Sequence, residues 1–194
     1  MQPLTTQDLW PLPVYEGVRD QFRREVIAAK QYRRVHVGPV ITLIFENRLT
    51  VKFQVQEILR AERVTKPEAV AEELEGFNAM LPASDELSAT LMIELIGAEA
   101  EVAAELRKLT GLSQHLFLEL GGTRRAASFD AGRDDGTRVS AVQYVRFPMA
   151  GAAGLLTDVS VPAHLVISHP HYQHRTVLPE GVRRSLAADL EERA

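Results

Sequence analysis

The apolar run at residues 40–45 constrains this chain more than any other stretch of it. Its β-branched and aromatic residues favour a buried strand, and Gly38 and Pro39 directly before it are typical of a turn. Ahead of the turn, Arg34 and His36 alternate with valines, and in a strand this alternation places both basic side chains on one face. The chain must therefore build a core around a strand whose flanks carry polar and charged groups.

The segment that follows, residues 49–64, shows two patterns at once. Up to Gln56 apolar and polar residues alternate strictly, which is the pattern of a half-buried strand. Val51, Val55 and Leu59 also recur at helical spacing. The helical pattern continues past Gln56, where the alternation fails, so we favour a helix. A strand followed by a helix stays open as the alternative.

The other patterns predict an α+β fold, a mixed β-sheet covered by helices, with an N-terminal helical segment. Apolar residues at four-residue spacing predict amphipathic helices at 13–32, 67–77, 98–109 and from 180 onwards. Strands are expected at 89–96, 115–120, 124–129, 139–147 and 161–168, with a hairpin turn at 121–122 and a loop at 131–137. Two β-α-β units joined by a hairpin strand are reminiscent of ferredoxin-like folds. That fold hosts many activities and therefore implies none.

A loop at residues 78–86 is the best internal boundary. It separates an N-terminal helical and strand segment (1–80) from an α+β sheet region (81–172), and a C-terminal helical tail follows (173–194). We expect these segments to form one compact domain. Residues 1–12 form an N-terminal arm. Apolar residues of this arm and of the tail would stay exposed in a compact monomer, so we predict a homodimer. They are Leu4, Leu9 and Trp10 in the arm, and Val182, Leu186 and Leu190 in the tail.

Composition excludes several kinds of chemistry. The chain has no cysteine, which excludes thiolate nucleophiles, disulfides, Cys-ligated zinc and self-ligated iron–sulfur clusters. No signal-peptide pattern and no run of membrane-spanning length occurs, so we expect a cytoplasmic protein without a membrane partner. The net charge of -4 argues against nucleic acid as a partner. Residues 19–63 nevertheless hold ten basic and five acidic residues, which would suit an anionic ligand.

Polar residues around the buried strand are the first candidates for a ligand-binding site. Isolated charges are costly to bury, so each must be paired or face a ligand. The candidates are Arg34, His36, Glu46, Arg48, Gln56, Glu57 and Arg60. Among them we expect Glu46 and Arg34 to be structural, and Gln56 and Arg60 to face the ligand. Ion pairs that brace the core are the alternative use of the charged members.

The histidine-rich segment at residues 164–174 is the second candidate. It holds His164, His169, His171 and His174, and imidazole is a common ligand of zinc, iron and copper. If a divalent metal is bound, we expect His169 and His171 among its ligands. The spacing matches neither HExxH nor a facial triad, so a solvated turn is the favoured interpretation and no cofactor is expected.

Several segments resemble a known family. RRVHVGP (33–39), ITLIFENR (41–48) and TVKFQVQEILRAER (50–63) resemble uncharacterised bacterial proteins grouped as the domain of unknown function 3501 family, with weaker similarity in TLMIEL (90–95), VQYVRF (142–147) and HPHY (169–172). The similarity reaches about residue 172 and leaves out the tail. The family has no established activity. Its genes lie near those of rubrerythrin-like and iron–sulfur oxidoreductase proteins, which implies an accessory role in iron or redox metabolism.

Without cysteine, such a role implies binding to a redox-system protein partner rather than electron transfer. We therefore predict a non-catalytic binding or accessory protein. The alternative is a metal- or anion-dependent enzyme that uses the histidines of 164–174 or the Arg/Glu constellation of 34–63. Metal analysis of the purified protein separates the two.

Overall fold

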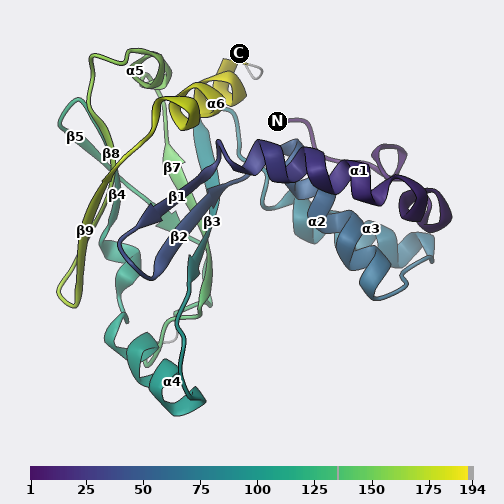
Figure 1. Ribbon diagram of the computed structural model, residues 1–194, viewed down its shortest axis with the longest axis horizontal. Helices are drawn as coiled ribbons and strands as arrows, with labels where there is room; N and C mark the ends of the chain where they lie inside the picture. The colour runs from purple at the N-terminus through teal and green to yellow at the C-terminus, as the bar shows by residue number, and fades with distance from the viewer. Residues whose placement is uncertain (135, 192–194) are drawn as a thin grey trace.

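Two antiparallel sheets and a lobe of N-terminal helices make up the computed structural model, which describes residues 1–134 and 136–191 (Figure 1). The first sheet has the order β1-β2-β3-β7-β6, which are Arg34–Val37, Ile41–Phe45, Glu86–Ile93, Val142–Pro148 and Ser128–Phe129. The second has the order β5-β4-β8-β9, which are Thr123–Ala126, Leu116–Leu120, Ala163–His169 and Tyr172–Val177. One apolar core joins the inner faces of both sheets.

The helices gather at the ends and at one side of this sandwich (Figure 1). The lobe consists of the short 3-10 helix η1 and of α1, α2 and α3, which are Thr6–Asp8, Leu12–Lys30, Arg48–Ala61 and Pro67–Asn78. Helix α4 lies at one end of the sandwich, and α5 and α6 lie at the other. These are Glu99–Lys108, Ala153–Thr157 and Glu180–Glu191, and a second 3-10 helix, η2, is Leu112–Gln114. No described helix is long and apolar enough to cross a membrane.

The predicted α+β class is confirmed, while the arrangement of the strands differs from the expected single mixed sheet. The strands form two sheets in place of one sheet built from two β-α-β units, and every pairing between the named strands is antiparallel. Residues 124–129 divide between β5 and β6, which belong to different sheets. The predicted loop at 131–137 includes residue 135, which lies outside the described residues.

The strand predicted at residues 40–45 is confirmed as β2. All five of its residues are buried, because its inner side chains enter the sandwich core and its outer face is also covered. In β1, Arg34 and His36 are exposed while Val35 and Val37 are buried, as the alternation predicts.

The ambiguous segment after β2 is helical, as favoured. Its cap is Asn47, whose side chain accepts from the Thr50 amide at 3.1 Å, while the Asn47 amide donates to the Thr50 hydroxyl at 3.0 Å. Val51, Val55 and Leu59 are buried in the core of the lobe. That burial favours the helical period over the alternating one.

Strand β9 was not predicted from the sequence. It pairs with β8 in a hairpin that turns at Pro170 and His171, in the segment expected to be a solvated turn. The Tyr172 hydroxyl donates to the carbonyl of Val37 at 2.6 Å and accepts from the amide of Val40 at 3.2 Å. This side chain therefore fastens the β1–β2 turn of one sheet to the edge of the other.

The C-terminal helix packs on its own chain. Val182, Leu186 and Leu190 are buried in the sandwich core, and Leu4 of the arm is buried in the lobe. The apolar surfaces that motivate the predicted homodimer are therefore largely covered within one chain. The three predicted segments also interleave, because β1 and β2 share a sheet with β3 and β7.

Candidate functional site

A groove between the end of α1 and strand β1 gathers the basic residues that are best placed to meet a ligand. Its volume is about 370 Å³, and it is lined by Ile27 and Lys30 of α1, by Gln31 directly after the helix, and by Arg34 and His36 of β1. The helix turns directly into the strand, so side chains from both elements face the same hollow. Two of the sequence-predicted candidates, Arg34 and His36, lie here.

The groove is electropositive because its cations lack acidic partners. Neither Lys30 nor Arg34 has an ion pair within the described part of the chain, although Lys30 lies 5.9 Å from the ring centroid of Phe53. Four other basic residues of 19–63 are neutralised, in the pairs Arg19–Glu57, Arg33–Asp189, Arg48–Asp8 and Arg60–Glu16. An unpaired guanidinium beside an ammonium group favours carboxylate or phosphate oxygens.

His36 is held in one orientation by a chain of hydrogen bonds. Its Nδ1 lies 2.9 Å from the Thr42 hydroxyl, and this hydroxyl donates to the carboxylate of Glu94. A carboxylate only accepts, so the single Thr42 proton points at Glu94 and the hydroxyl must accept from His36. Nδ1 therefore carries a proton, and Nε2 of the neutral ring keeps its lone pair. Such a nitrogen can accept a proton from a ligand, or donate to one when the ring is charged.

Glu46 directly follows β2, and its carboxylate is hydrogen-bonded within the fold. The residue is buried, and its carboxylate accepts from the hydroxyls of Thr50 at 2.5 Å and Thr90 at 2.6 Å and from the Gln54 amide at 3.1 Å. These donors join the start of α2 to β3. They leave the carboxylate no role towards a ligand.

Gln56 and Arg34 exchange the roles expected for them. Gln56 is fully buried, and its side chain accepts from the Trp10 amide at 2.6 Å and donates to the Trp10 carbonyl at 3.3 Å. It therefore fastens the N-terminal arm and faces no ligand. Arg34, expected to be structural, is exposed in the groove.

The remaining candidates form ion pairs that hold α1 and the arm against α2. The Arg19 guanidinium donates two hydrogen bonds to Glu57 and holds the pKa of that carboxyl below its usual value. Arg60 pairs with Glu16 at 2.8 Å. Arg48 reaches the carboxylate of Asp8 in the arm at 2.7 Å.

The four histidines of 164–174 are not brought to one point. Both ring nitrogens of His169 are used, since Nε2 lies 3.0 Å from the Thr110 carbonyl and Nδ1 accepts from the His171 amide at 3.2 Å. His164 is buried on β8, where burial lowers its pKa, and His174 packs on the Tyr172 ring. Among the described residues no three His, Asp or Glu side chains group as metal ligands.

Lys30, Gln31, Thr42 and Glu94 are site residues that sequence reasoning missed. The scarcity of lysine in an arginine-rich chain is a weak signal for Lys30. Thr42 and Glu94 meet His36 only through strand register, in which Thr42 lies opposite His36 and Met92. Register of this kind is set by the whole sheet.

Comparison with known proteins supports the family and gives no activity. A family model described as "Protein of unknown function (DUF3501)" matches residues 3–190, so the similarity extends through the tail. A crystal structure of a protein of unknown function from Burkholderia pseudomallei K96243 is 31% identical, covers 97% of this chain and 100% of that chain, and superposes with a TM-score of 0.89. The search of curated proteins found no match. The chain therefore belongs to the DUF3501 family.

Proposed function

We propose that this protein binds a small anion, a carboxylate or a phosphate, in the groove between α1 and β1. The observation that carries the proposal is the pair Lys30 and Arg34, two cations without an ion pair among the described residues, on the walls of one hollow of about 370 Å³. Both cations are therefore available to the oxygens of an anion that enters the groove. The link to iron or redox metabolism rests on the family resemblance alone and is separate from this proposal.

The lining narrows the class of ligand. A hollow of this size lies at the lower end of the range of small-molecule sites, which begins at roughly 300 Å³. Arg34 and Lys30 supply charge, Gln31 supplies an amide, and Ile27 supplies an apolar surface that is 47% exposed. A small organic acid or phosphate ester, with a short apolar part against Ile27, fits these walls.

Calorimetric titration at low ionic strength, with succinate and inorganic phosphate as probes, tests the proposal. Arg34→Gln should weaken binding by about tenfold or more, because a hydrogen bond to a charged group contributes roughly 1.5–3 kcal/mol. Arg107→Gln is the matched control, since it removes one exposed positive charge on α4. Raising the salt concentration should weaken binding further. Equal affinities in the two variants, or no binding of either probe, would refute the proposal.

An acid–base enzyme is the second candidate, and the Glu94–Thr42–His36 chain favours it. A carboxylate that orients an imidazole through a hydroxyl leaves Nε2 prepared to take a proton from a bound acid. Nitrogen NMR of the histidine rings checks the predicted tautomer. In Thr42→Val the His36 ring should no longer favour the tautomer that is protonated at Nδ1. An unchanged tautomer would rule out the acid–base enzyme.

A further inference from the structure

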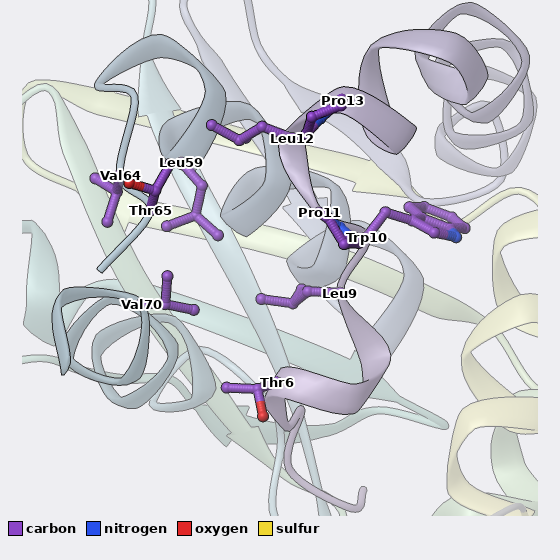
Figure 2. Close-up of a pocket in the computed structure, with 10 residues that line it drawn as sticks. All are labelled: Thr6, Leu9, Trp10, Pro11, Leu12, Pro13, Leu59, Val64, Thr65 and Val70. Atoms are coloured by element: carbon purple, nitrogen blue, oxygen red, sulfur yellow. The ribbon is translucent and has the colours of Figure 1, made fainter. Parts of the chain in front are cut away.

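A second cavity lies in the lobe, at the other end of α1. It has a volume of about 300 Å³ and lies between the N-terminal arm and helices α2 and α3. Its apolar side chains come from the arm, from α1, α2 and α3 and from the loop between α2 and α3, and include Leu9, Leu12, Leu59, Val64 and Val70. Figure 2 shows these five side chains around a common space. The basic groove shares none of them.

The lining is aliphatic. Its only polar side chains are the hydroxyls of Thr6 and Thr65, apart from the indole of Trp10, and the Trp10 ring is turned away from the aliphatic groups (Figure 2). That ring packs edge-on against Phe22 at 5.0 Å, with the Lys52 ammonium 3.7 Å from its centroid. A guest in the cavity therefore meets leucine, valine and proline surfaces and no aromatic face.

The wall formed by the arm is held open. Gln56 fixes the backbone of Trp10 from inside the lobe, and the next residue, Pro11, has a restricted φ. On the other side of Leu9, Asp8 is paired with Arg48 at 2.7 Å. An apolar hollow whose wall cannot collapse keeps a surface that water wets poorly, and filling it with hydrocarbon is favourable.

We propose that this cavity binds the alkyl chain of a medium-chain fatty acid, with the carboxylate at the rim. An apolar cavity of about 150 Å³ accepts the six carbons of benzene, so twice that volume accepts a chain of roughly ten carbons. Lys66 is exposed and directly follows the lining residue Thr65 in the chain. Its positive charge suits an anionic head group.

The dependence of affinity on chain length tests the proposal directly. Calorimetric titration measures the binding, because the Trp10 ring is turned away from the aliphatic lining and its emission need not report a guest (Figure 2). Saturated acids from hexanoate to tetradecanoate are titrated below the concentrations at which they form micelles. Affinity should rise by about fourfold for each CH₂ added, and level off near ten carbons, when the cavity is full.

Two variants that fill the cavity locate the site. Val70→Phe, and Thr65→Phe at an exposed position of the lining, should each weaken decanoate binding by more than tenfold. Val159→Phe, at a residue that is 63% exposed and outside the lining, should leave it unchanged. If Val70→Phe does not fold, Thr65→Phe still decides.

Three outcomes would overturn the proposal. The first is that calorimetry detects no binding of decanoate, and the second is that decanoate binds all three variants equally well. The third is that light scattering shows a dimer that Val70→Phe or Thr65→Phe dissociates, which would assign the cavity to a second copy of the chain.

Discussion

At the scale of single residues, Gln56 fastens the N-terminal arm. We expect Gln56→Ala to destabilise the protein by about 1–3 kcal/mol, because the Trp10 amide and carbonyl lose a buried partner. Thermal melts measure the loss, and the emission of Trp10 should shift as the arm loosens. Gln21→Ala, at an exposed position of α1, is the control. Equal melting temperatures for the two variants would contradict the role given to Gln56.

Asp8 makes the attachment of the arm sensitive to acid. Backbone and side-chain hydrogen bonds, first from the Thr5 amide and then from Arg48, lower the pKa of Asp8 from 3.8 to about 2. A lowered pKa means that the folded state favours the carboxylate, so this stabilisation is present above pH 3.8 and is lost as the pH falls through about 2. We expect Trp10 emission to report loosening of the arm in that window. In Asp8→Asn this acid-dependent change in Trp10 emission should disappear. If the change persists, another titrating group causes it.

At the scale of elements, helix α6 is held by a buried ion pair. Arg33, directly before β1, pairs with Asp189 of α6, and both are buried. Removing one partner leaves a buried charge, so Asp189→Ala should cost about 3–5 kcal/mol. Arg184→Ala breaks the exposed pair with Glu180 on the same helix and should cost about 0–1 kcal/mol. Chemical denaturation compares the two, and similar costs would show that the buried pair does not hold the helix.

At the scale of the whole molecule, the lobe and the sandwich should unfold together. The chain alternates between them, and Glu46 joins β3 of the sandwich to α2 of the lobe. Trp10 emission reports the lobe and far-UV circular dichroism reports the whole chain, so the two denaturation curves should coincide. Separate midpoints would show two independent units.

The homodimer expected from the sequence remains a prediction about the whole molecule. Its motivating tail residues are buried in the chain's own core, and the large apolar side chains that remain exposed include Ile96, Val159 and Val177. Single exposed apolar residues are ordinary on a monomer. A monomer in light scattering at micromolar concentration would end the prediction.

The sequence by itself determined the features that depend on neighbouring residues. Strand β2, the alternation in β1, the helical choice for α2 and the helix at the tail all follow from periodicity, caps and turns within a few positions. The resemblance at residues 33–63 likewise identified the family. Within the candidate site, Arg34 and His36 were named because their alternation shows which strand face they share.

Only the tertiary structure decided what those residues contact. Gln56 became a buried anchor because a segment 46 positions away packs on it. Arg33 is buried against Asp189, 156 positions away, whereas its neighbour Arg34 is exposed in the groove. Thr42 and Glu94 reached His36 through the register of three strands, and β9 exists because β8 offers it an edge. Local patterns state which face a side chain takes, whereas its partners depend on how distant segments close on one another.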